Sequence, residues 1–335
     1  MNKFNYQSIY APYFKQFIGI KKGLGFVSLR AEWIFLELDG FFLSKKVKEI
    51  GITKEQIDEW RSTRLNDAPV TIYTKYSVLS QFCKYLCKAG YNCYIPRLPA
   101  TSPQVSFTPY IFTNQQMADI FWAYDNFEMY DRHMSTAIFM MPALIRVLYG
   151  TGLRISEALS LKNKDADLAN GCLYIRKSKN GDERIAPLSE GLVNVLKQYL
   201  QYRNRIPLSH LNDDNKFFFV STLGTNCTQG TAYRWFKKAL AVSGIPHQGD
   251  HKGPRVHDVR HSYAIHSLEK MAKSGLDLYY SLPLLSKCLG HKSLQSTDRY
   301  VRLTAEMYPD LLKDEKGICS YVFPKTNKII NNGND

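Results

Sequence analysis

The segment LGHKSLQSTDRY, residues 289–300, raises the clearest functional question in the chain. An apolar helical pattern precedes it, Gly290 is a natural cap for the end of that helix, and His291 follows immediately. Ser293 is expected to cap a second helix, on which Tyr300 lies two turns along and nine residues after His291. A tyrosine in such a helix usually packs against its neighbours. Whether Tyr300 takes part in chemistry therefore depends on residues elsewhere in the chain.

A second segment, TGLRISEAL at residues 151–159, combines an apolar helical stripe with a charged pair. Arg154 and Glu157 are three residues apart, so they share one helix face and the carboxylate can orient the guanidinium. Most pairs of this kind are surface ion pairs without a further role. The pair alone therefore does not indicate a site.

A third segment, IRKSKNGDERIAPL at residues 175–188, predicts a β-hairpin with strands at 172–176 and 184–188. Lys179 lies at the expected tip, where a long side chain can reach a ligand. A solvated lysine in a polar turn is the common alternative. The run KFFFV at residues 216–220 predicts one more strand.

A fourth segment, HDVRHSYAIHSL at residues 257–268, places His257 and Arg260 on one helix face. Together they suit a phosphate, because arginine offers a planar fork of donors and histidine can move a proton near neutral pH. His261 and His266 compete for the histidine's role, but neither has an arginine at the same offset. A polar stripe on a helix is the alternative interpretation.

In their order and spacing, the four segments resemble the signature of the tyrosine recombinase (phage integrase) family. That signature is an Arg in TGLRxSE, a Lys on a β-hairpin turn, HxxR, LGH, and a Tyr nine residues after the LGH histidine. The matching residues are Arg154, Lys179, His257, Arg260, His291 and Tyr300. Lys177 is close to Lys179, and the match of ERIAPL to the family's hairpin favours Lys179. The resemblance covers residues 110–305, and the YVR that begins at Tyr300 departs from the common YxH ending.

The resemblance implies that DNA strands are cut and rejoined through a covalent 3′-phosphotyrosyl intermediate. Tyr300 is then the nucleophile, and a phenol with a pKa of about 10 needs help at neutral pH. Arg154 and Arg260 would bind the non-bridging phosphate oxygens, with His291 as an additional donor. His257 is the expected general base and Lys179 the general acid for the leaving 5′-oxygen. No cofactor, metal ion or ATP is expected, since the acidic residues near the signature do not form a cluster for two ions.

Composition is compatible with a DNA partner. The formal net charge is +14, from 44 Lys and Arg against 30 Asp and Glu, which indicates a polyanionic ligand. The most apolar run, residues 137–149, is too short to span a membrane, and the N-terminus lacks the features of a signal peptide. The seven cysteines include no CxxC pair, so neither a disulfide framework nor a zinc site is indicated. We therefore expect a cytoplasmic protein, associated with the bacterial nucleoid when it binds DNA.

The expected fold is mostly α with a small β-sheet or hairpin, an α+β class in two domains. Residues 1–95 form a helical, basic core-binding domain, in which the capping box TKEQ at 53–56 begins a helix. A second capping box, TNQQ at 113–116, begins the first helix of the next domain. Up to residue 100 there are 15 Lys and Arg against 8 Asp and Glu, which is half of the chain's net charge. Residues 96–110 are a proline-rich linker. The catalytic domain covers residues 111–320 and carries the nucleophile helix near its end, and residues 321–335 are a tail that is flexible or exchanged with a neighbour.

The expected partners are duplex recombination sites. The resemblance implies a homo-tetramer on two duplexes, with accessory DNA-bending or directionality proteins. Integration or excision of a bacterial mobile element is the favoured task, although the sequence does not separate integration, excision and chromosome-dimer resolution. The alternatives are a type IB topoisomerase, a DNA-binding regulator without catalysis, and a metal-dependent nuclease or transposase. The target DNA sequence cannot be predicted, because specificity depends on base contacts and DNA deformability.

Overall fold

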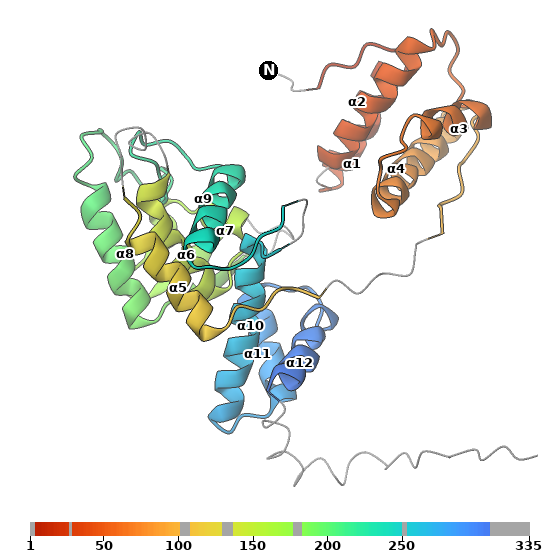
Figure 1. Ribbon diagram of the computed structural model, residues 1–335. Coiled ribbons are helices and arrows are strands. Elements are labelled where there is room, and N and C mark those ends of the chain that lie inside the picture. The colour runs from red at the N-terminus through yellow and green to blue at the C-terminus, as the bar shows by residue number, and fades with distance from the viewer. Residues whose placement is uncertain are drawn as a thin grey trace, which may run out of the picture. The chain divides into compact units, whose positions relative to one another are not determined.

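The computed structural model describes residues 4–26, 29–100, 108–128, 137–176, 183–249 and 253–308, apart from the side chain at position 305. The chain divides into two compact units, Met1–Phe107 and Thr108–Asp335, and each is described here by itself (Figure 1). Lys179 and the C-terminal residues 309–335 lie outside the described residues. The proposed roles of Lys179 and of the tail therefore stay predictions.

The N-terminal unit is built from helices only, within its described residues. They are α1 (Ala11–Gly23), α2 (Leu29–Ser44), α3 (Lys54–Ser62) and α4 (Pro69–Lys88). The predicted capping box at α3 is present, with the Thr53 side chain accepting from the backbone of Gln56 and the Gln56 side chain accepting from Thr53. Proline suits the first position of α4, because the backbone N–H there has no partner inside the helix.

Aromatic rings fill the core of this unit. Phe14 stacks on Phe35 with their ring centroids 4.6 Å apart. Phe82 lies 4.8 Å from Phe14 and 5.0 Å from Phe35, so α1, α2 and α4 meet at one cluster of rings. All three phenylalanines are fully buried. Packing of large apolar rings therefore holds the unit together.

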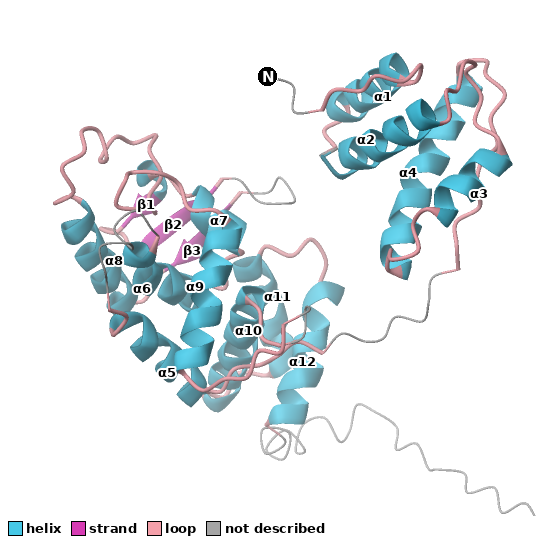
Figure 2. Cartoon of the chain, turned by 45° about the horizontal axis from the view of Figure 1, so that its top comes forward, coloured by secondary structure: helices cyan, strands magenta, loops and turns pink. Residues whose placement is uncertain are grey.

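In the C-terminal unit helices pack against a small sheet (Figure 2). Its helices are α5 (Asn114–Asp125), α6 (Met141–Thr151), α7 (Ile155–Ser160), α8 (Glu190–Arg203), α9 (Gln229–Val242), α10 (Val256–Lys273), α11 (Leu278–Leu289) and α12 (Gln295–Met307), with 3-10 turns η2 (Ile138–Met140) and η3 (Asn163–Asp165). The antiparallel sheet has the order β1 (Ala166–Asp167), β2 (Cys172–Ile175), β3 (Arg184–Pro187). Residue 172 pairs with residue 187 and residue 175 with residue 184. This confirms the α+β class and the predicted hairpin strands, and adds the two-residue strand β1.

The core of the unit is in two parts. One apolar cluster joins α5, α6, α8, α9 and the sheet, and a second joins α10, α11 and α12, which lie together in Figure 1. No helix in the described part of the chain is long and apolar enough to cross a membrane.

The strand predicted at residues 216–220 is wrong. The structure has only isolated bridges there, from Phe217 to Lys162 and from Val220 to Asn226. The hydroxyl of Tyr199 donates to the Phe218 carbonyl and accepts from the Val220 N–H, both at 3.1 Å. A buried side chain thus satisfies backbone groups that a neighbouring strand would otherwise bind.

Candidate active site

Arg154 stands at the start of α7, directly after a turn that requires glycine. Gly152 ends α6 with a φ of 62°, in the left-handed region. A Cβ at this position would also lie 2.3 Å from the ring of Tyr263, so both conformation and space demand glycine. The turn places the Arg154 backbone N–H 3.0 Å from Oε2 of Glu157, while Nη1 donates to Oε1 at 2.8 Å. Glu157 therefore fixes both the backbone and the side chain of Arg154.

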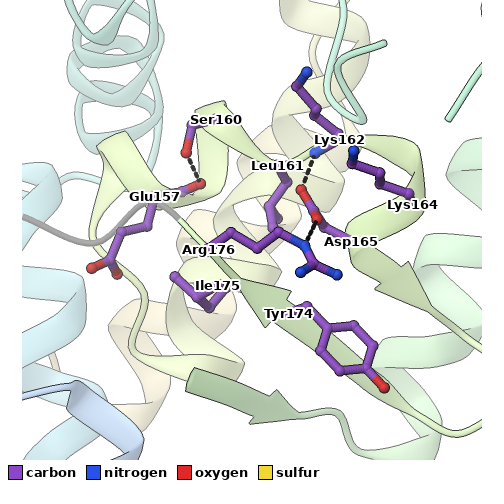
Figure 3. A pocket seen from close by; sticks show the side chains of 9 residues that line it. All are labelled: Glu157, Ser160, Leu161, Lys162, Lys164, Asp165, Tyr174, Ile175 and Arg176. Atoms are coloured by element: carbon purple, nitrogen blue, oxygen red, sulfur yellow. Dashed lines mark hydrogen bonds and ion pairs between the residues drawn. The ribbon is translucent and has the colours of Figure 1, made fainter. Parts of the chain in front are cut away.

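Glu157 is almost fully buried and is shared by two arginines. Arg184 of β3 donates to it from Nη2 at 2.7 Å and from Nη1 at 3.3 Å. Burial on its own would raise the pKa of Glu157, but hydrogen bonds and charge from Arg184 and Arg154 outweigh it and hold that pKa below its usual value. A pocket of about 150 Å³ lies next to it, where Arg176 binds Asp165 and the Glu157 carboxylate points away from that pair (Figure 3).

Arg260 connects three elements from the interior of α10. It is 2% exposed. Nη1 donates to the Gly152 carbonyl and Nη2 to the Leu289 carbonyl, each at 2.7 Å. Nη2 also lies 3.0 Å from Nε2 of His291. The arginine of HDVR is thus held between the TGLR turn and the LGH turn.

His291 follows a second obligatory glycine. Gly290 ends α11 with a φ of 64°, which confirms the predicted cap. Nε2 of His291 receives the Arg260 hydrogen bond, so this nitrogen is assigned as the acceptor, and Nδ1 donates to Thr297 Oγ1 at 2.8 Å. The predicted cap at Ser293 is wrong, because α12 begins one residue later with Leu294 at its N-cap and no side-chain cap. Thr297 instead fixes the turn to α12 by its bond to His291.

Tyr300 is 1% exposed, and its hydroxyl lies 2.7 Å from Nδ1 of His261. The guanidinium of Arg299 lies over the Tyr300 ring at 5.3 Å, and its Nη2 is 3.4 Å from the same histidine nitrogen. The ring of His291 is nearly parallel to the tyrosine ring, with centroids 6.3 Å apart. The phenol therefore lies among two histidines and an arginine in the interior of the unit.

His261 is the hydrogen-bond partner of Tyr300, whereas the sequence pattern favoured His257. The ring of His257 packs against His261 with centroids 4.9 Å apart, and no hydrogen bond joins His257 to Tyr300 in the described part of the chain. The available clue was the spacing of four, which puts both histidines on one face of α10. His266, the other competitor, bonds to the Tyr149 hydroxyl at 2.7 Å, away from this cluster.

Burial and positive charge keep the cluster's imidazoles neutral. Burial first, and then the nearby arginines, lower the pKa of His257 to about 4 and that of His291 to about 4. Burial, the neighbouring His257 and the arginines lower the pKa of His261 to about 3. Burial and Arg154 lower the pKa of Arg260 to about 10, so it stays charged at neutral pH. Neutral imidazoles that can accept a proton thus stand beside fixed cations that attract an anion.

The structure brings five of the six predicted residues into one region, and Lys179 lies outside the described residues. Arg154, Arg260 and His291 carry donors or cations, and His257 is a neutral imidazole packed against His261, the partner of Tyr300. Among the described residues, no group of three or more His, Cys, Asp or Glu is placed to hold a metal ion. Such a set of phenol, neutral histidines and arginines suits attack on a phosphodiester.

Known proteins are similar to this chain in sequence and in fold. The profile of the phage integrase family matches residues 111–307. The integrase/recombinase y4rB of Sinorhizobium fredii is 26% identical, over 89% of this chain and 94% of that protein. The tyrosine recombinase XerD of Proteus mirabilis is 26% identical, over 86% of this chain and 87% of its own. A lambda integrase tetramer bound to a Holliday junction has a similar fold, with a TM-score of 0.58 and 18% identity over 86% of this chain and 75% of that one.

Proposed function

The chain belongs to the phage integrase family, and from this premise we propose how its residues cut and rejoin DNA. It is a tyrosine-type site-specific DNA recombinase with DNA recombination sites as its partners. The observation that carries the proposed chemistry is the placement of the Tyr300 hydroxyl, 2.7 Å from His261, within the cluster that holds Arg260 and His291. In this proposal Tyr300 is the nucleophile.

In the first step the Tyr300 oxygen bonds to phosphorus and the bond from phosphorus to the 5′-oxygen breaks. The phenol proton passes to His257, whose depressed pKa keeps it neutral before the reaction. Arg154 and Arg260 stabilise charge on the non-bridging oxygens, assisted by His291. Lys179 supplies the proton for the leaving oxygen. A 5′-hydroxyl of another strand reverses these steps, so each broken bond is replaced. In this proposal the reaction therefore uses neither ATP nor a metal ion.

The described conformation precedes attack in this proposal. A tyrosine that is 1% exposed and bonded to His261 offers its hydroxyl no open path to a phosphate. Movement of α12 would transfer the hydroxyl from His261 to the arginines. His257 packs against His261, the hydrogen-bond partner of the Tyr300 hydroxyl, and this supports His257 as the base at the start of that movement.

For the assembly, we propose a homo-tetramer on two duplexes that serves a bacterial mobile element in the cytoplasm. The likeness to y4rB, which is named as an integrase/recombinase, supports this task. The likeness to lambda integrase, whose solved assembly is a tetramer on a Holliday junction, supports the oligomer. The basic N-terminal unit would bind the DNA backbone, with affinity that falls as salt rises. Accessory DNA-bending or directionality proteins complete the proposal.

The test is a covalent trap in EDTA. Labelled duplexes from the DNA that flanks the gene, each with a nick that prevents religation, are mixed with wild type or Tyr300→Phe and quenched in SDS. We expect label at protein size with wild type and none with the variant. Label that persists with Tyr300→Phe would mean another nucleophile. Relaxation of plasmids without site preference would favour the topoisomerase alternative, and binding without transfer would favour the regulator.

A further inference from the structure

Arg184 is a buried arginine that the proposed chemistry does not use. It lies on β3, and its side chain is 9% exposed. Its guanidinium donates to both carboxylate oxygens of Glu157, and Nε donates to the carbonyl of Cys288 at 3.0 Å. One side chain thus ties the hairpin to the start of α7 and to the last turn of α11. Arg154 is the N-cap residue of α7, and His291 follows the end of α11 by two residues.

The first link runs through a carboxylate with no spare oxygen. Oε1 of Glu157 accepts from Arg154 and Arg184, and Oε2 accepts from the Arg154 backbone and from Nη2 of Arg184. The plane of the carboxylate is therefore set by both arginines at once. Without Arg184, a buried carboxylate would lose its strongest geometric constraint and could turn, and Arg154 would turn with it.

The second link runs through the turn before His291. A Cβ at Gly290 would lie 2.8 Å from Nη1 of Arg184, so the guanidinium lies directly against this turn. Its bond to Cys288 fixes the turn two residues before Gly290. His291 comes next and meets Arg260 at 3.0 Å. The position of Arg184 therefore affects both Arg154 and His291.

We propose that Arg184 is a positioning residue that holds Arg154 and His291 in one geometry around the scissile phosphate. The proposal rests on the function proposed above. Three of the five N–H groups of Arg184 are engaged within the protein, and in this proposal Arg184 acts through these neighbours. Only arginine meets the geometry, because a fork of donors binds a carboxylate and a carbonyl at once, whereas lysine is a single point donor.

The rival explanation is that Arg184 merely anchors β3. Arg203 offers a matched control, since it is a buried arginine, 2% exposed, that donates to the Phe218 carbonyl at 3.1 Å and to Asn163 at 2.7 Å without contact to the site. Arg184→Lys and Arg203→Lys remove a buried fork of the same kind. A fault of folding affects both variants, whereas a fault of positioning affects only Arg184→Lys.

The experiment measures single-turnover formation of the covalent complex at saturating nicked duplex. We expect Arg184→Lys to slow it about 100-fold, the usual effect of misplacing a catalytic group by about 1 Å. DNA affinity should stay within about twofold, and Arg203→Lys should keep a rate near that of wild type. Wild type and Tyr300→Phe run in parallel. Failure of the wild type to form a complex would refute the proposed function, whereas an unaffected Arg184→Lys beside an active wild type refutes only this inference.

A double-mutant cycle shows whether Arg184 acts through Arg154. If it does, Arg184→Lys adds little to the defect of Arg154→Lys. Fully additive defects, or a defect confined to DNA affinity, would overturn the proposal. If Arg184→Lys does not fold, as judged by circular dichroism, Glu157→Gln breaks the same link from the carboxylate side. That variant must then show the slow rate and the non-additivity with Arg154→Lys, and a normal rate would overturn the proposal.

Discussion

The interiors of the two units contain different kinds of side chain. The N-terminal unit buries rings against rings, and its buried Asp39 accepts hydrogen bonds from the backbone and hydroxyl of Ser8. The region around α10 buries Arg260 and His261 beside the phenol of Tyr300. Both interiors are buried, but in the described residues only the second places imidazoles, a guanidinium and a phenol in contact. We interpret the first as organised for stability and the second for the proposed chemistry.

The difference has a physical cost that identifies the site. Buried charges and unpaired imidazoles destabilise a fold unless hydrogen bonds compensate for lost hydration. Arg260 recovers part of this through two backbone carbonyls, and Glu157 through two arginines. The lowered pKa values of the three histidines mean that a proton on any of them would destabilise this region. Burial also raises the pKa of Tyr10 in the aromatic core to about 12, but in the described residues only the region around α10 combines lowered histidine pKa values with a buried arginine, a pattern typical of functional regions.

The largest expected effect on stability comes from the aromatic core. Phe82→Ala removes a ring that contacts Phe14 and Phe35, and should destabilise the N-terminal unit by about 3–5 kcal/mol. Hydrogen exchange read by peptide should show faster exchange in residues 1–107 and unchanged exchange in α10–α12. Phe26→Ala, at a ring that is 60% exposed, is the control with little effect. Equal loss in both units would show that their stabilities are not independent.

The polar interior should respond in the opposite way. Arg260→Met should slow covalent-complex formation by about 10²–10³-fold, the usual loss when a donor to a developing oxyanion is removed. Its stability should fall less than that of Phe82→Ala, because loss of two hydrogen bonds is offset by relief from burying a charge. Thermal unfolding and single-turnover rates measure the two effects. A larger loss of stability than for Phe82→Ala, with an intact rate, would make Arg260 a structural residue.

The third expected effect is a difference between the two units in how their stability depends on pH. All eight histidines lie after residue 107. His257, His261 and His291 have folded pKa values of about 4, 3 and 4, below the unfolded value near 6.5. The unfolded chain then binds more protons, so the stability contributed by the neutral imidazoles is full above about pH 6.5 and is lost as pH falls towards 4. Asp258, whose pKa burial raises, opposes this with one group.

Peptide-resolved hydrogen exchange between pH 7 and 4.5, corrected for intrinsic rates, measures the acid effect. Protection in α10–α12 should decline across this range, and α1–α4 should show no decline from histidine. His261→Gln removes the most depressed of the three pKa values and should flatten the decline. A decline of equal slope in both units would mean that carboxylates, not histidines, control acid stability.

Local features of the fold could be predicted because short-range physics fixes them. The capping boxes at α3 and α5 and the end of α11 at Gly290 depend on residues a few positions apart. The strand predicted at residues 216–220 failed because Tyr199, distant in sequence, satisfies that backbone. An apolar run alone does not show which partner its backbone will find.

The site divides in the same way. The residues of the signature could be named from order and spacing, but their contacts could not. The sequence pairs Glu157 with Arg154, three residues away, whereas Arg184 reaches the same carboxylate from 27 residues away. The bond from Tyr300 to His261 spans 39 residues and depends on how α10 and α12 pack. Contacts of this range arise from tertiary packing, which periodicity does not encode.

The smallest expected effect concerns two helix caps, and tests whether the stability that a cap contributes is the same in both units. Thr53 and Thr113 open α3 and α5 with the same reciprocal capping box, and each accepts from the backbone of the glutamine three residues on, at 3.3 and 3.1 Å. Thr→Ala at either site should cost about 1 kcal/mol, and Thr→Ser should cost much less because the hydroxyl is kept. Each loss should appear only in its own unit in hydrogen exchange. Because a cap satisfies backbone N–H groups at the surface, its value does not depend on what the unit buries. If Thr113→Ala instead costs several times more than Thr53→Ala and also slows DNA cleavage, the start of α5 supports the polar interior, and the division between stability and chemistry extends into the helix termini.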